Sequence, residues 1–224
     1  VLMSQKLPAA VVFDWDNTLI DTFPLIFAGN NLVRREFGLA EWSEAECHQY
    51  SQLSAKEMFT QYYGDRAAEA EKIFYGHIRA HHLTSLKVMA EAENLVLFLI
   101  QKGVKLGIVS NKRGEVLRQE VAALNWNHHF LAVLGPDDVG GVGKPDPRGV
   151  CQALAQLGLE SNDYSNTWYI GDTPNDIKTA KAAGMISVFI ENASTQDPKE
   201  IAALQPDYSF KSCVECLAYI KTLI

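Results

Sequence analysis

Five short apolar segments, each followed by small or polar residues, constrain the fold of this chain more than any other feature. They cover residues 10–13, 105–109, 131–134, 167–170 and 186–190. Continuous apolar runs of this length are typical of strands that are buried on both faces of a parallel sheet. The segments therefore predict a parallel sheet that other elements must cover on both sides.

Helical periodicity between these segments predicts helices that can cover the sheet. Leu117, Val121 and Leu124 repeat at helical spacing, and similar patterns end before Gly158 and Gly184. Glycine is favoured just after the C-terminus of a helix because it tolerates a left-handed backbone. The alternation of strand and helix predicts an α/β fold with a doubly wound, Rossmann-like parallel sheet.

One interval between strands is too long for this alternation. About ninety residues separate the first two apolar segments, whereas a single crossover helix needs far fewer. Within this interval residues 23–37 have a helical period, and Ser43 with Glu46 forms a capping-box pattern. We therefore expect an α/β core domain of residues 1–20 and 86–224, with an all-helical cap domain of residues 21–85 inserted into it.

Charge and composition exclude some classes of partner. The net charge of -7 and the pI of about 5.4 predict no binding to nucleic acid or to an anionic membrane surface. The longest apolar stretch is too short to span a bilayer, and no secretory signal pattern is found. Cys213 and Cys216 lack the further ligands of a zinc site, so we expect buried thiols on a short helix of a cytoplasmic protein.

Two aspartates follow the first apolar segment. Ligands of open parallel sheets bind beyond the carboxyl ends of the strands, and Asp14 and Asp16 stand at such an end. An ionised carboxylate can attack phosphorus and can bind Mg²⁺, while a second carboxyl can carry protons. A polar turn would use the same residue types, so this pair alone leaves both interpretations open.

Polar residues also follow the later segments. Ser110 and Asn111 come after the second segment, Lys144 stands in a Gly- and Pro-rich stretch after the third, and Asp172 and Asp176 come after the fourth. A hydroxyl, free backbone N–H groups and an ammonium suit a phosphate, and paired carboxylates suit a hard cation. Taken singly, Ser110 could be a helix cap and Asp176 a helix N-terminal charge. Together they predict one crevice around the central strand.

These residues resemble the motifs of the haloacid dehalogenase superfamily of aspartate-based phosphohydrolases. Four motifs match in chain order: Asp14, Asp16 and Thr18 for the first, Ser110 for the second, Lys144 for the third, and Gly171, Asp172 and Asp176 for the fourth. The helical insertion resembles the cap of the phosphoglycolate phosphatase and beta-phosphoglucomutase branch. The first motif departs from many relatives of that branch, which have Gly where this chain has Asn17. Because Asn tolerates unusual backbone angles, we expect the turn to be kept.

The resemblance implies a role for each matched residue. Asp14 would be the nucleophile that forms an aspartyl-phosphate, and Asp16 would protonate the leaving oxygen and then activate water. The implied substrate-binding residues are Thr18, Ser110, Asn111 and Lys144. The implied Mg²⁺ ligands are the Asp14 and Asp172 carboxylates and the Asp16 backbone carbonyl, with Asp176 binding directly or through water. Trp15, which is bulkier than the usual residue there, is expected to pack beneath the site.

The function predicted in this way is a Mg²⁺-dependent phosphatase that acts on a small phosphorylated metabolite similar to phosphoglycolate. A phosphosugar mutase would use the same nucleophile and remains an alternative. A non-catalytic phospholigand-binding protein is disfavoured because both Asp14 and Asp16 are present. A dehalogenase is disfavoured because dehalogenases of this superfamily lack the second aspartate of the first motif.

Overall fold

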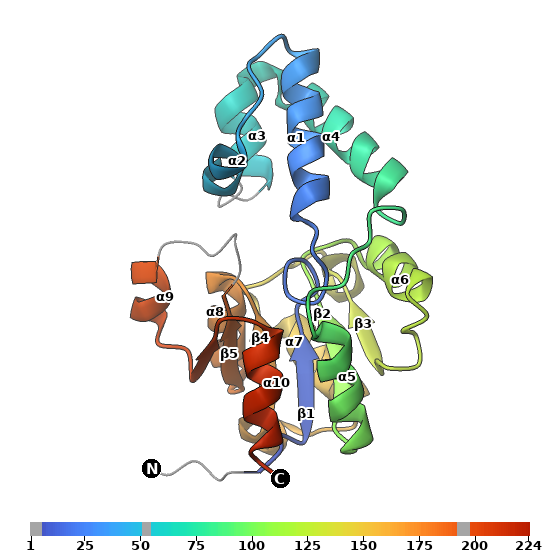
Figure 1. Ribbon diagram of the computed structural model, residues 1–224, viewed down its shortest axis with the longest axis vertical. Coiled ribbons are helices and arrows are strands. Elements are labelled where there is room, and N and C mark those ends of the chain that lie inside the picture. The colour runs from blue at the N-terminus through green and yellow to red at the C-terminus, as the bar shows by residue number, and fades with distance from the viewer. Residues whose placement is uncertain (1–5, 51–54, 192–197) are drawn as a thin grey trace. The chain divides into compact units, whose positions relative to one another are not determined.

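A parallel sheet forms the centre of the larger part of the chain in the computed structural model, which describes residues 6–50, 55–191 and 198–224 (Figure 1). Its strands are β1 (Ala10–Phe13), β2 (Lys105–Val109), β3 (Ala132–Leu134), β4 (Thr167–Gly171), β5 (Ile186–Ile190) and β6 (Tyr208–Phe210). The strand order is β3-β2-β1-β4-β5-β6, with every neighbouring pair parallel. The predicted fold class is confirmed, with β1 in the middle and β2 and β4 beside it.

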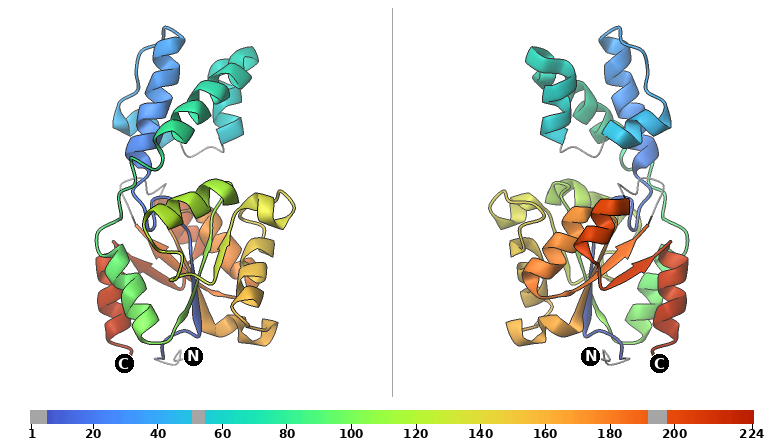
Figure 2. Two further views of the ribbon diagram at one scale, coloured as in Figure 1. Left: turned by 90° about the vertical axis from the view of Figure 1, so that its right-hand side faces the viewer. Right: turned by 90° about the vertical axis from the view of Figure 1, so that its left-hand side faces the viewer.

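Helices cover both faces of this sheet, as a buried parallel sheet requires. They are α5 (Ala92–Gln101), α6 (Gly114–Ala123), α7 (Arg148–Gln156), α8 (Pro174–Ala183), α9 (Pro198–Leu204) and α10 (Cys213–Lys221). Helices α5 and α10 lie side by side against one face, and α7 and α8 cover the other (Figure 2). Gly158 and Gly184, the predicted stops, have φ values of +72° and +74° beyond α7 and α8.

Strand positions follow the apolar segments closely, with three differences. β3 begins at Ala132, one residue after the predicted start at Leu131, whose side chain is 62% exposed. β4 extends through Gly171, one residue beyond the predicted end. β6, a strand of only three residues at the edge of the sheet, is not predicted from the sequence; its Tyr208 and Phe210 are half-buried and its Ser209 is exposed.

Residues 22–87 form a second compact unit, separate from the unit of residues 1–21 and 88–224. Its helices are α1 (Phe23–Glu36), α2 (Glu44–Tyr50), α3 (Ala55–Tyr63) and α4 (Ala67–His81). The described residues of this unit contain no strand. Ser43 and Glu46 form the predicted capping box, in which the Glu46 carboxylate accepts from the Ser43 backbone N–H at 2.8 Å and the Glu46 N–H donates to the Ser43 hydroxyl.

An aromatic cluster gives the helical unit its own core. The buried members include Trp42, Phe59, Tyr63 and Phe74, and the Phe59 and Phe74 rings meet edge to face at 5.4 Å. Buried aromatic side chains contribute large apolar surfaces to such a core. The interpretation of the two units as core and cap domains, with the boundaries given above, stays a prediction.

Two further sequence expectations concern helices. Cys213 and Cys216 are buried free thiols on α10, as predicted. None of the described helices is both long and apolar enough to cross a membrane.

Candidate active site

The carboxyl ends of three adjacent strands place the predicted site residues together. Phe13 of β1 pairs with Ile108 of β2 on one side and with Ile170 of β4 on the other. The chain leaves β1 with Asp14, whose N–H donates to the Ile170 carbonyl at 2.8 Å. Because parallel strands all present their carboxyl ends to one edge, the residues that follow β1, β2 and β4 converge there.

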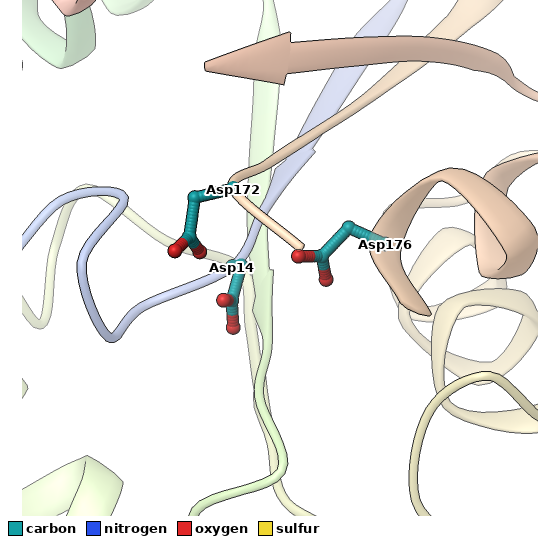
Figure 3. A group of neighbouring side chains, drawn as sticks. All are labelled: Asp14, Asp172 and Asp176. Atoms are coloured by element: carbon teal, nitrogen blue, oxygen red, sulfur yellow. The ribbon is translucent and has the colours of Figure 1, made fainter. Parts of the chain in front are cut away.

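Three carboxylates meet at this edge. Asp14 follows β1, Asp172 follows β4, and Asp176 lies in the first turn of α8 (Figure 3). One oxygen from each lies within 4.8 Å of the others, and all three residues are buried. Asp16, a predicted ligand through its backbone carbonyl, does not bring its side chain into this cluster.

The Lys144 ammonium lies between two members of this cluster. Its Nζ is 2.6 Å from Asp14 Oδ1 and 2.7 Å from Asp176 Oδ1. The Lys144 side chain is only 5% exposed, so both ion pairs are shielded from water. A buried ammonium at this position can neutralise an anion that approaches Asp14.

The charge balance of the cluster favours a bound cation. Burial raises the pKa of the Asp14 carboxyl well above its usual range, and Asp176 and Asp172 push it further up against the opposing effect of Lys144. Burial alone would lower the pKa of Lys144, but the carboxylates of Asp14 and Asp176 outweigh it and raise that pKa. Lys144 compensates only one of the three acids, and the oxygen donor set is the kind that hard divalent cations prefer. These residues therefore fit Mg²⁺.

Local backbone geometry holds Asp176 in position. Its Oδ2 accepts from the Thr173 N–H at 2.9 Å and from the Thr173 hydroxyl at 2.6 Å, while Oδ1 faces Lys144. A Cβ atom at Gly171 would lie 2.3 Å from Asp176 Cγ. Glycine is thus required at the end of β4 because the Asp176 side chain packs against its backbone. Asp176 is both a helix N-terminal charge and a member of the cluster.

Thr18 and Asn111 hold other site residues by hydrogen bonds. The Thr18 hydroxyl donates to Asp172 Oδ1 at 3.0 Å. The Asn111 amide accepts from the Lys144 N–H at 2.7 Å and donates to the Lys144 carbonyl at 3.3 Å. A Cβ at Gly143 would come within 2.5 Å of Asn111 Oδ1, so glycine there permits this contact. Substrate binding by Thr18 and Asn111 stays a prediction.

Ser110 lies at the end of β2. It is 3% exposed, and its hydroxyl accepts from the Lys112 N–H at 3.1 Å. A side-chain oxygen that bonds to a nearby backbone N–H is the local arrangement expected where a strand turns into a helix. Its predicted contact with a substrate phosphate likewise stays a prediction.

Asp16 occupies a tight turn beside the cluster. Asn17, the next residue, has a φ of +58°, so the positive backbone angle expected of this turn is confirmed. The Asn17 N–H donates to the Ile20 carbonyl at 2.6 Å. The Asp16 Oδ1 accepts from Lys112 Nζ at 2.7 Å, and 28% of the Asp16 side chain is exposed.

Two residues near the site, Lys112 and Glu120, are not among those predicted from the sequence. The Lys112 ammonium bonds both Asp16 and the buried carboxylate of Glu120, each at 2.7 Å. A signal for Glu120 was present, because it lies one residue before Val121 and three after Leu117 on the apolar face of α6. A carboxylate at such a position is rarely buried without a partner.

Comparisons with known proteins find similar sequences and a similar fold. The family model described as "Haloacid dehalogenase-like hydrolase" matches residues 11–190. A phosphoglycolate phosphatase of Rhodospirillum rubrum is 28% identical over 204 residues, covering 86% of this chain and 83% of that protein. A pyrophosphatase of Listeria welshimeri is 27% identical over 222 residues, covering 98% of this chain and 99% of that protein. A solved hydrolase of the same family from Streptococcus pneumoniae shares the fold with a TM-score of 0.82 at 21% identity, covering 97% of this chain and 99% of that one.

Proposed function

Because the chain belongs to the haloacid dehalogenase-like hydrolase family and its relatives are phosphatases, we propose that it is a Mg²⁺-dependent phosphatase acting through an aspartyl-phosphate on Asp14. Its substrate would be a small phosphorylated metabolite of the phosphoglycolate type. The observation that supports this most directly is the buried cluster of Asp14, Asp172 and Asp176 bridged by Lys144.

Asp14 would act as the nucleophile in the first step. One of its carboxylate oxygens attacks phosphorus, the bond from phosphorus to the leaving oxygen breaks, and the Asp16 carboxyl gives its proton to that oxygen. In the second step a water oxygen attacks the phosphorus of the aspartyl-phosphate. The Asp16 carboxylate takes a proton from the water, the bond between Asp14 and phosphorus breaks, and orthophosphate leaves.

The remaining site residues would place and neutralise the transferring group. Lys144 and the Ser110 hydroxyl would contact its oxygens, and Thr18 would hold Asp172 as it does in the structure. Mg²⁺ would be held by the carboxylates of Asp14 and Asp172, with Asp176 beside them, and when bound it supplies positive charge to phosphoryl oxygens. Positioning and charge neutralisation account for most of the catalysis of phosphoryl transfer.

The helical unit would serve as a cap that selects the leaving group. Every phosphomonoester presents the same phosphoryl group to Asp14, so residues outside the carboxylate cluster must distinguish one substrate from another. We assign this role to residues 22–87, which form a compact unit with an aromatic core of its own.

The test is phosphate release from a panel of small phosphomonoesters and pyrophosphate, with and without Mg²⁺. We expect one ester to be preferred, with turnover that stops when the metal is chelated. Asp14→Asn should abolish release while thermal unfolding stays cooperative. Asp146→Asn makes the same chemical change at a residue that pairs with Arg148 and should keep full activity. Activity retained by Asp14→Asn would remove Asp14 as nucleophile.

Failure of the whole panel would also be informative. Isomerisation of a phosphosugar that requires a bisphosphate activator, without net release of phosphate, would replace the phosphatase by a phosphosugar mutase on the same nucleophile. Turnover that is unchanged by chelation would contradict the metal site.

A further inference from the structure

A carboxylate is buried behind the site, where an apolar residue would be expected. Glu120 of α6 is 1% exposed, although its neighbours Leu117 and Val121 belong to the apolar core. A buried carboxylate is costly unless it is paired and hydrogen-bonded. Its partners should therefore explain why a charge is kept at this position.

Glu120 has two donors on a single oxygen. Its Oε2 accepts from the Lys112 ammonium at 2.7 Å and from the Trp15 indole N–H at 2.6 Å. Trp15 is fully buried and meets the Trp126 ring edge to face, with centroids 6.0 Å apart. Trp15 is a packed core residue, as expected, and its indole N–H adds a second anchor for the Glu120 carboxylate.

Lys112 connects this buried carboxylate to the reacting groups. Its Nζ also donates to Asp16 Oδ1 at 2.7 Å, and only 14% of the Lys112 side chain is exposed. Burial alone would lower the pKa of Lys112, but Asp16 and Glu120 raise it above its usual value, so the ammonium stays charged. A series of hydrogen bonds thus connects the buried Trp15 through Glu120 and Lys112 to Asp16.

We propose that Lys112 and Glu120 are positioning residues that fix the rotamer of Asp16, so that its second carboxyl oxygen is presented to the leaving group. This inference rests on the proposed function, in which Asp16 protonates the leaving oxygen. Lys112 occupies Oδ1, which leaves Oδ2 as the oxygen that carries the proton. Glu120, held in turn by Trp15, keeps the flexible Lys112 side chain from turning away.

The chemistry gives this proposal a distinctive consequence. A leaving group that is a strong base needs a proton as it departs, whereas a weakly basic one departs with little help. Loss of Asp16 positioning should therefore slow esters of weakly acidic alcohols far more than esters of acidic ones. A variant that merely weakens the fold would reduce both by the same factor.

Phenyl phosphate and 4-nitrophenyl phosphate provide the test. The two esters are nearly the same size and transfer the same group, but 4-nitrophenol is much the stronger acid. We would measure kcat and KM for both with wild-type enzyme, Lys112→Met and Glu120→Gln, in saturating Mg²⁺. Glu115→Gln, at an exposed position on the same helix, is the matched control.

We expect Lys112→Met and Glu120→Gln to lower kcat for phenyl phosphate by at least ~10-fold, part of the ~10²- to 10⁴-fold that a positioned acid contributes. The loss for 4-nitrophenyl phosphate should be no more than about 3-fold, with KM nearly unchanged for both. Glu115→Gln should match the wild type. Trp15→Phe, which keeps the ring buried but removes the indole N–H, should show the same selectivity with a smaller loss.

Equal losses for both esters in Lys112→Met and Trp15→Phe would overturn the proposal, even if Glu120→Gln fails to fold. Unchanged kinetics in all three variants would overturn it too. Wild-type enzyme that releases phosphate from neither of these esters nor any in the panel would refute the proposed function itself, which is a distinguishable outcome.

Discussion

Replacing Lys144 by Met should lower both the melting temperature and the turnover, and Mg²⁺ should restore only the melting temperature. Lys144 Nζ lies 2.6 Å from Asp14 and 2.7 Å from Asp176, and the side chains of all three residues are no more than 7% exposed. Methionine keeps the length and volume of the side chain but cannot compensate the two carboxylates. Removal of one partner from a buried ion pair costs ~3–5 kcal/mol.

This cost should appear as a lower melting temperature in the absence of metal. For a protein of this size, ~1 kcal/mol corresponds to about 2–4 °C, so we expect a fall of roughly 6–20 °C. Saturating Mg²⁺ should stabilise Lys144→Met more than it stabilises the wild type, because a cation can take up the uncompensated charge. Turnover should stay at least ~10²-fold low even with Mg²⁺, because the ammonium that is proposed to contact the phosphoryl group is missing.

The assay is thermal unfolding with chelator and with Mg²⁺, followed by phosphate release with the best ester of the panel. Lys178→Met is the matched control. Lys178 pairs with Glu200 at 3.3 Å on the surface, with side chains 43% and 46% exposed, so its loss should cost less than ~1 kcal/mol. If metal-free Lys144→Met had the same melting temperature as the metal-free wild type, the charge balance described for the cluster would be refuted. Full turnover of Lys144→Met would refute the proposed role of Lys144 in catalysis.

Three further predictions concern neighbouring residues. Gly171→Ala should displace the Asp176 carboxylate, since the added Cβ would lie 2.3 Å from Cγ, and we expect loss of turnover and weaker Mg²⁺ binding by titration calorimetry. Asn17→Ala should lower the free energy of unfolding by ~1 kcal/mol, because alanine resists the +58° φ angle, whereas Asn17→Gly should lower it less in the same denaturant titration. Mg²⁺ at ~100 times its dissociation constant should stabilise the wild type by about 2.7 kcal/mol, and thermal unfolding should show most of this gain lost in Asp172→Asn.

The sheet could be predicted from sequence because its strands are buried on both faces. A strand such as residues 186–190, with burial along nearly its whole length, leaves a continuous apolar run. The short edge strand β6 leaves no such run, because Ser209 between its two aromatic residues is exposed and the pattern is only three residues long. Alternation over so few positions does not distinguish a strand from a loop.

The carboxylate cluster could be predicted for a different reason. Residues that follow the ends of adjacent parallel strands are brought together by topology, so Asp14 and Asp172 needed no knowledge of side-chain packing. The interactions of Asn111 and Glu120, in contrast, could not be predicted without knowledge of side-chain packing. The Asn111 amide holds the backbone of Lys144, thirty-three positions away, and Glu120 meets Trp15 at a separation of 105 positions. Pairings at such distances follow from packing alone and have no local pattern.

The proposed positioning of Asp16 by Lys112 and Glu120 also bears on which substrate the enzyme prefers. Similar relatives are named phosphoglycolate phosphatase and pyrophosphatase, so related chains transfer one phosphoryl group from leaving groups of different basicity. An alkoxide is a stronger base than a phosphate leaving group, so its departure depends more on a proton from a general acid, the role proposed for Asp16. If the Lys112 and Glu120 contacts hold Asp16 for that purpose, their loss should reduce hydrolysis of phosphoglycolate more than hydrolysis of pyrophosphate. On this proposal, the Lys112 bond to Asp16 would favour the alkyl ester, in addition to the selection assigned to residues 22–87.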